Sequence, residues 1–217
     1  LVDELVPRSK LMEVAMERAN EFADQSTRPT NAKGITLKPI AREVTGSTIT
    51  YITMAVNIDR EQFTAEITVY APEDKPPQQK DAIHAAGADF WHLAFARDLD
   101  DFILHMRANE PEIGTWVFKS SGVAEHIEAG DKALLENADD WLAREITLYL
   151  KRTLKRLDVS SRSIISLIEP ESCFTGTILE LVLASDRSYM LDGAFEGSNL
   201  PAATIRPTGM NFGPLPM

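Results

Sequence analysis

Hydrophobic and polar residues alternate in two adjacent stretches of the first half of the chain. Apolar side chains occupy every second position from Ile52 to Ile58, and the alternation resumes from Phe63 to Val69. The four polar residues between them, Asp59 to Gln62, have the composition of a turn. Because side chains of a strand point to opposite faces in turn, this pattern predicts a β-hairpin with one buried face.

Elsewhere apolar residues recur at intervals of three and four, the spacing of one face of a helix. Such stretches run from Pro7 and Ser9 to Ala23, from Leu93 to Met106, and from Asp140 to Leu157. The segment Glu110-Pro111-Glu112 ends the second helix ahead of a short apolar strand at Trp116 to Lys119. Residues 73–80, EDKPPQQK, have the composition of a loop.

The most informative stretch is Arg162 to Tyr189. Apolar residues from Ile164 to Ile168 predict a buried strand, Pro170 ends it, and Gly176 opens an apolar helix. The predicted order is therefore hairpin, helix, strand, helix, strand, helix, which is typical of an α/β fold.

The first turn of that last helix carries free N–H donors and the positive end of the helix dipole. Such a turn can hold an oxyanion or polarise a carbonyl. Glu180 lies one turn further on, where its carboxylate could reach a group bound at those amides.

Composition narrows the class of protein. The chain has 217 residues, 44% of them hydrophobic, which suffices for a core, and its net charge of −11 argues against a nucleic-acid partner. The basic residues Lys151, Arg152, Lys155 and Arg156 share one polar helix face and are interpreted as a solvated surface.

Cysteine and histidine usage excludes other classes. The single cysteine, Cys173, cannot form an internal disulfide and is interpreted as a small buried apolar residue. No histidine or thiol cluster has metal-ligand spacing, so we expect no metal and no cofactor. We expect no membrane span or signal peptide either, and hence a cytoplasmic protein.

Several motifs carry a family resemblance. The sequence ELVLASD at Glu180 to Asp186, after a glycine turn, resembles the crotonase superfamily of enoyl-CoA hydratases and isomerases. The longer segments NEPEIGTWVFKS, MNFG and residues 152–191 resemble the benzoyl-CoA-dihydrodiol lyases, also called epoxybenzoyl-CoA dihydrolases. The resemblance implies a crotonase-like spiral of repeated strand-strand-helix units.

The same resemblance implies a division of the chain. Residues 1–34 resemble the helical tail that closes one crotonase module, and residues 35–217 resemble most of a divergent second module. We therefore expect a piece of a longer, two-module protein. The catalytic cysteine and glutamates of the first module are expected to lie upstream of Leu1.

The resemblance also assigns candidate site residues. The two amides of a thioester oxyanion hole fall at Ala129-Gly130, in a loop after a strand, and at Gly176-Thr177. The first family glutamate aligns with Glu180, whereas the second is replaced by Gly209. The alternatives without a catalytic role are a turn at 176–177 whose amides bond to backbone or water, and a helix carboxylate at 180 that is paired with neighbouring groups.

Glu169 and Glu171 lie close in sequence to the candidate site. They could replace the missing glutamate, although a solvent-facing loop beside Pro170 is the simpler interpretation.

Three functional hypotheses follow. In the first, the chain is the scaffold and dimer-supporting part of a lyase whose other module opens an oxidised benzoyl-CoA ring hydrolytically and releases formate, in aerobic benzoate degradation. In the second, it is itself an acyl-CoA hydratase or hydrolase that uses Glu180 and the two amides. In the third, it is a non-enzymatic interaction module. The first two imply a CoA-thioester substrate, and the first implies a homodimer.

Overall fold

The computed structural model describes residues 2–28, 31, 33–193, 195, 197 and 199–215. The chain divides into two compact units, Leu1–Gly34 and Ile35–Met217. The first unit holds a 3-10 turn, Arg8–Lys10, and the predicted helix α1, Leu11–Asp24, none of whose residues is buried. That this unit is the tail of a preceding module stays a prediction.

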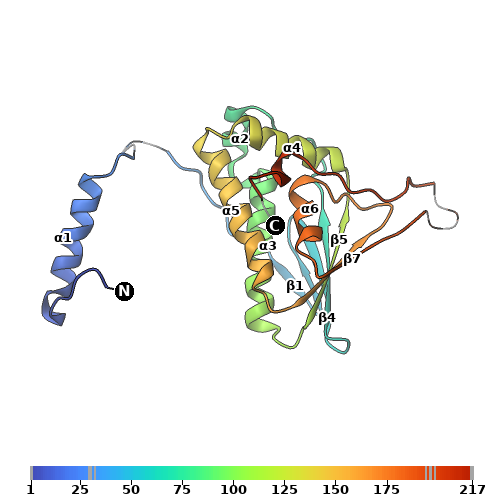
Figure 1. Ribbon diagram of the computed structural model, residues 1–217, viewed down its shortest axis with the longest axis horizontal. Coiled ribbons are helices and arrows are strands. Elements are labelled where there is room, and N and C mark those ends of the chain that lie inside the picture. The colour runs from blue at the N-terminus through green and yellow to red at the C-terminus, as the bar shows by residue number, and fades with distance from the viewer. Residues whose placement is uncertain are drawn as a thin grey trace. The chain divides into compact units, whose positions relative to one another are not determined.

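The second unit is built on a seven-stranded sheet whose strands follow one another in chain order (Figure 1). The strands are β1, Glu43–Thr45; β2, Thr48–Thr50; β3, Met54–Asp59; β4, Thr64–Tyr70; β5, Thr115–Ser121; β6, Ser163–Ile168; and β7, Arg187–Met190. Neighbours from β1 to β4 are antiparallel, and neighbours from β4 to β7 are parallel.

The parallel strands are joined by helices. These are α2, Lys80–Ala86; α3, Trp91–Asn109; α4, Ala124–Glu136; α5, Trp141–Asp158; and α6, Gly176–Leu183, with 3-10 turns at Gly87–Asp89 and Gly209–Asn211. The predicted hairpin, the long helices and both buried strands are confirmed, and with them the mixed α/β fold.

The predicted hairpin is β3 and β4, and its turn follows from local chemistry. The Asp59 carboxylate accepts hydrogen bonds from the backbone N–H groups of Glu61 and Gln62, both at 2.9 Å. The turn closes at Phe63, whose φ of +56° lies in the left-handed region. The carboxylate of Asp59 thus accepts from two backbone N–H groups that have no partner in the hydrogen bonds between β3 and β4.

One face of the sheet carries the core. Alternate residues of the central strands are fully buried there, among them Val56, Ile67, Trp116, Phe118 and Ile164. Figure 1 shows the helices on this side of the sheet, with α3 and α5 packed against each other. The opposite face of the strands is only half-buried or exposed.

Among the described residues, no helix combines the length and the apolar character that crossing a bilayer requires.

The buried face predicts the effect of core truncation. Replacing Phe118, which is fully buried on β5, by alanine should lower the free energy of unfolding by about 3–5 kcal/mol, because it leaves a cavity. Phe212→Ala is the matched control, since that ring is 77% exposed, and should change stability by less than ~0.5 kcal/mol. Equal midpoints of urea denaturation for both variants would contradict the assigned core.

Candidate functional site

The carboxyl ends of β4, β5 and β6 meet at one edge of the sheet because these strands are parallel. Binding sites of α/β proteins gather at this edge. Pockets near this edge include one of about 510 Å³ beyond β4 and one of about 600 Å³ beyond β5 and β6. A further pocket of about 420 Å³ is lined by residues of the 75–78 loop and of α4, Ala129 among them. Helix α6 begins at the same edge, after the loop that follows β6.

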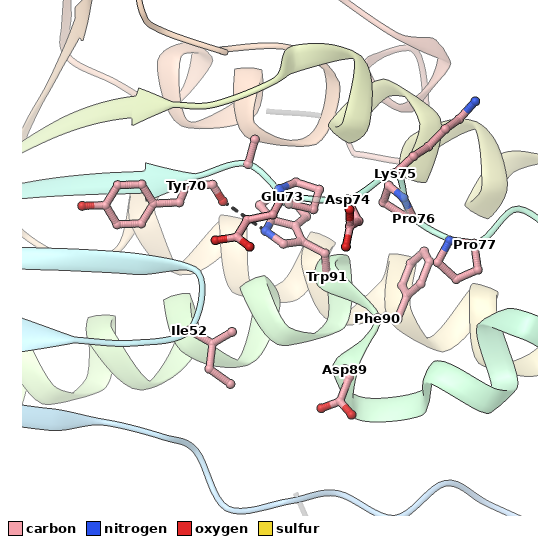
Figure 2. Close-up of a pocket in the computed structure, with 12 residues that line it drawn as sticks. Ile52, Tyr70, Glu73, Asp74, Lys75, Pro76, Pro77, Asp89, Phe90 and Trp91 are labelled. Carbon is pink, nitrogen blue, oxygen red and sulfur yellow. Dashed lines mark hydrogen bonds between the residues drawn. The ribbon is translucent and has the colours of Figure 1, made fainter.

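The pocket beyond β4 is shown in Figure 2. Trp91 lies inside it and donates a hydrogen bond from its indole N–H to the carbonyl of Tyr70 at 3.1 Å. The carboxylates of Glu73, Asp74 and Asp89 surround the pocket. Lys75 also lines the pocket, and Lys38 forms a salt bridge with Asp89, so the rim carries charges of both signs.

The pocket beyond β5 and β6 is lined by three loop segments, residues 121–125, 170–172 and 200–206. Its one guanidinium, Arg206, forms salt bridges with Glu125 and Glu128, both at 2.9 Å. The guanidinium of Arg206 is therefore already paired with two carboxylates of α4.

The junction between β6 and α6 forms as the sequence predicts. Strand Ser163–Ile168 leads through a loop in which Cys173 and Phe174 are buried, and α6 begins at Gly176. Gly176 has a φ of +45°, a conformation that favours glycine. The predicted helix N-terminus is thus present at the predicted residues.

The N-terminus of α6 is occupied by a carboxylate of the same chain. Asp131, fully buried on α4, accepts a 3.0 Å hydrogen bond from the backbone N–H of Thr177 and a 2.5 Å bond from its hydroxyl. The hydroxyl of Thr208 donates to the same carboxylate at 2.7 Å, and Nε2 of His92 lies 2.9 Å from it. The carboxyl group thus occupies the helix N-terminus at which the sequence analysis expected a substrate oxyanion.

The remaining amides of the first turn are also engaged. They donate to backbone carbonyls: Gly176 to Arg206 at 3.0 Å, Ile178 to Thr175 at 3.1 Å, and Leu179 to Thr175 at 3.3 Å. All four N–H groups that a helix start leaves free therefore have acceptors within the chain. None is available to polarise a thioester carbonyl without breaking one of these bonds.

Glycine is required at position 176 for two reasons: its positive φ, and the close approach of the Asp131 and Thr208 side chains to its α-carbon. A β-carbon at this position would lie 1.7 Å from Oδ2 of Asp131 and 2.8 Å from the side chain of Thr208. The glycine that the crotonase resemblance assigns to substrate binding here accommodates an internal side chain instead.

The prediction for Ala129 and Gly130 is wrong in its local structure. Both residues lie inside α4, Ala124–Glu136, rather than in a loop after a strand. An N–H in the middle of an α-helix donates to the carbonyl four residues earlier, so these amides cannot form an oxyanion hole. The loop that follows β5 is at residues 122–123.

Gly130 has a packing role in this arrangement. A β-carbon there would lie 2.1 Å from Cε1 of His92, so the glycine lets the imidazole lie against α4. The ring is fully buried, and its Nδ1 has no hydrogen-bond partner among the described residues. Nε2, which lies 2.9 Å from Oδ1 of Asp131, is thus the ring nitrogen that contacts the carboxyl group.

Glu180 is fully buried, and its Oε1 accepts a 2.6 Å hydrogen bond from the side-chain amide of Asn211. The same amide also donates to the carbonyl of Gly176 at 2.9 Å. Glu180 is not among the residues that line these three pockets. The carboxylate is thus held by a neighbouring side chain, as the simpler interpretation of this residue expected.

Gly209, the position expected to have lost the second glutamate, begins the 3-10 turn Gly209–Asn211. A β-carbon there would lie 2.8 Å from Leu135, so the backbone packs closely on α4. Of the possible replacements, Glu169 lies 4.0 Å from Lys119, and Glu171 is exposed at the rim of the 600 Å³ pocket.

Asp131, Thr208 and Asn211 were not singled out as site residues by the sequence. Asp131 and Thr208 lie far from α6 along the chain, and nothing local to them signals a shared site. Within the part of the chain that the structure describes, no group of His, Cys, Asp or Glu side chains could hold a metal ion.

The predicted resemblance is confirmed by comparison with known proteins. The chain is 41% identical over all 217 residues to a benzoyl-CoA-dihydrodiol lyase from Aromatoleum evansii. It spans 38% of the length of that relative. No family model matches the chain.

Solved structures that match the chain include two named as enoyl-CoA hydratases or isomerases. One, from Geobacillus kaustophilus HTA426, is 17% identical with a TM-score of 0.41, over 70% of this chain and 48% of its own. The other, from Marinobacter aquaeolei, is 14% identical with a TM-score of 0.41, over 63% and 47%.

The Asp131 network predicts a large stability effect. Asp131→Asn should lower the free energy of unfolding by about 3 kcal/mol or more, because an amide cannot accept from all four donors and leaves buried groups unsatisfied. Asp139→Asn, an exposed change of the same type near the end of the α4–α5 loop, should be neutral within ~0.5 kcal/mol. Urea denaturation of both variants measures the difference, and equal stabilities would contradict the role given to Asp131.

Burial predicts the reactivity of Cys173. Desolvation raises the pKa of this thiol, so little reactive thiolate forms in the folded chain near pH 8. Because the chain has one cysteine, labelling of the 217-residue chain with a thiol reagent reports on this site alone. We expect labelling to be slow in buffer and complete in guanidinium chloride; rapid labelling of the folded chain would contradict the burial.

Proposed function

We propose that this chain is a portion of a benzoyl-CoA-dihydrodiol lyase of the crotonase superfamily. The identity over the whole chain supports this assignment. In this proposal the complete protein opens an oxidised benzoyl-CoA ring hydrolytically and releases formate, with a CoA thioester as its substrate and no cofactor of its own. It serves cytoplasmic breakdown of benzoate.

We further propose that this portion is a scaffold that supports assembly of a homodimer and does not perform the chemistry. The observation that carries this proposal is the Asp131 carboxylate at the N-terminus of α6. Stabilising a thioester enolate requires amide donors that are free when charge develops. Here the N–H of Thr177 already donates to the Asp131 carboxyl group, so it is not free for a substrate oxygen.

The state of Glu180 supports the same proposal. Acid or base catalysis needs a carboxylate within hydrogen-bond reach of the substrate, directly or through one water. Glu180 is fully buried, and its Oε1 accepts a hydrogen bond from Asn211. The reacting groups are therefore assigned to another part of the protein, upstream of Leu1.

The test is the Glu180→Gln substitution in the full-length protein. Glutamine keeps the acceptor for Asn211 but cannot act as a base, so the scaffold role predicts kcat and kcat/KM within about twofold of the unchanged protein. Glu136→Gln, an exposed change on α4, controls for nonspecific effects. A loss of roughly a hundredfold with Glu180→Gln alone would favour the alternative, an active acyl-CoA hydratase or hydrolase module that uses this residue.

A further inference from the structure

Residues 203–215 cross the N-terminus of α6 and belong to none of the seven strands of the sheet. Their backbone pairs with the loop ahead of α6 at an isolated parallel bridge between Arg206 and Thr175. Figure 1 shows the dark red end of this segment beside α4 and α6, and its 3-10 turn contacts both helices. We call residues 203–215 the strap.

The strap binds both backbone groups of Gly176, the first residue of α6. The carbonyl of Arg206 accepts a hydrogen bond from the N–H of Gly176 at 3.0 Å. The side-chain amide of Asn211 donates to the carbonyl of Gly176 at 2.9 Å. One of the four N–H groups at the start of α6 therefore has its acceptor in the strap.

The strap also contacts two fully buried carboxyl groups. The hydroxyl of Thr208 donates to Asp131 at 2.7 Å, and the amide of Asn211 donates to Oε1 of Glu180 at 2.6 Å. Lifting the strap would remove one donor from each carboxyl group and the acceptor of Gly176. The groups at the start of α6 thus depend on the strap for their hydrogen bonds.

Apolar burial holds the strap less firmly than it holds the core. Among its residues only Ala203, Met210 and Leu215 are buried, far fewer than in α3 or α5. Strand β7, which precedes the strap along the chain, is exposed at every position. Segments with few buried apolar contacts open at lower free energy than the core, so the strap can open while the inner strands stay paired.

We propose that the strap opens as one unit, while the sheet and the long helices stay folded, and that this opening uncovers the N-terminus of α6. In the closed form the N–H of Gly176 donates to Arg206, and in the open form it is released to solvent. The proposal describes a conformational step of this chain. It goes beyond the scaffold role and does not depend on where the chemistry occurs.

Residue-resolved hydrogen exchange of the unchanged full-length protein in low concentrations of urea tests this step. The amide of Gly176 should exchange together with strap amides such as that of Leu215, which donates to Met210 at 2.9 Å. Both should exchange roughly a hundredfold or more faster than the amides of β5, with a weaker dependence on urea, because a local opening exposes little surface. If Gly176 retains the protection of β5 while the strap exchanges, or if all three exchange together, the proposal is overturned.

A substitution in the strap gives a second test. Asn211→Asp keeps the size of the side chain and the acceptor for the N–H of Thr208, but it removes the donor to Gly176 and Glu180. Buried acceptors without a donor disfavour the closed form, so exchange at Gly176 and in the strap should accelerate by roughly tenfold or more, with β5 unchanged.

Asn199→Asp is the matched control, since that residue is exposed in the segment before the strap, and should leave exchange unchanged. Equal acceleration in β5, or none at Gly176, in the Asn211→Asp protein would contradict the strap as a separate unit. If that variant does not fold by circular dichroism, the urea series on the unchanged protein decides between the same outcomes.

Discussion

The hydrogen bonds that converge on the Asp131 carboxylate determine what this unit can do. They join α4, α6, the segment of Thr208 and, through His92, α3 in one buried network. A buried carboxylate is tolerable only when its charge is fully compensated, and here the N-terminus of α6 and two hydroxyls provide the compensation. The same bonds that hold three helices together remove the free amides that thioester chemistry requires.

The two faces of the sheet differ in how deeply their side chains are buried. The face under the helices buries alternate apolar residues and accounts for the core, whereas the opposite face of the strands is half-buried or exposed. The proposed scaffold role is consistent with a helix N-terminus whose first-turn amides already have acceptors within the chain.

The spacing of apolar residues along the chain predicted those helices and strands in which that spacing is regular. The alternation around Ile58 and Val69, the helical spacing that ends at Leu157 and the strand before Gly176 all became the expected structure. Helix α4 was missed because Ala129-Gly130-Asp131 was matched to a family loop, although a glycine is tolerated in a helix when a side chain such as His92 packs against it. The occupant of the α6 N-terminus could not be predicted, because Asp131 precedes Thr177 by 46 residues and only the fold brings them together.

The most direct test of this account is a crystal structure of the full-length protein with a non-reactive thioether analogue of benzoyl-CoA. The account predicts that Oδ2 of Asp131 remains at hydrogen-bond distance from the amide of Thr177 and that the analogue binds outside this unit. An analogue whose acyl oxygen accepts the Thr177 amide, with the Asp131 carboxylate displaced, would contradict it.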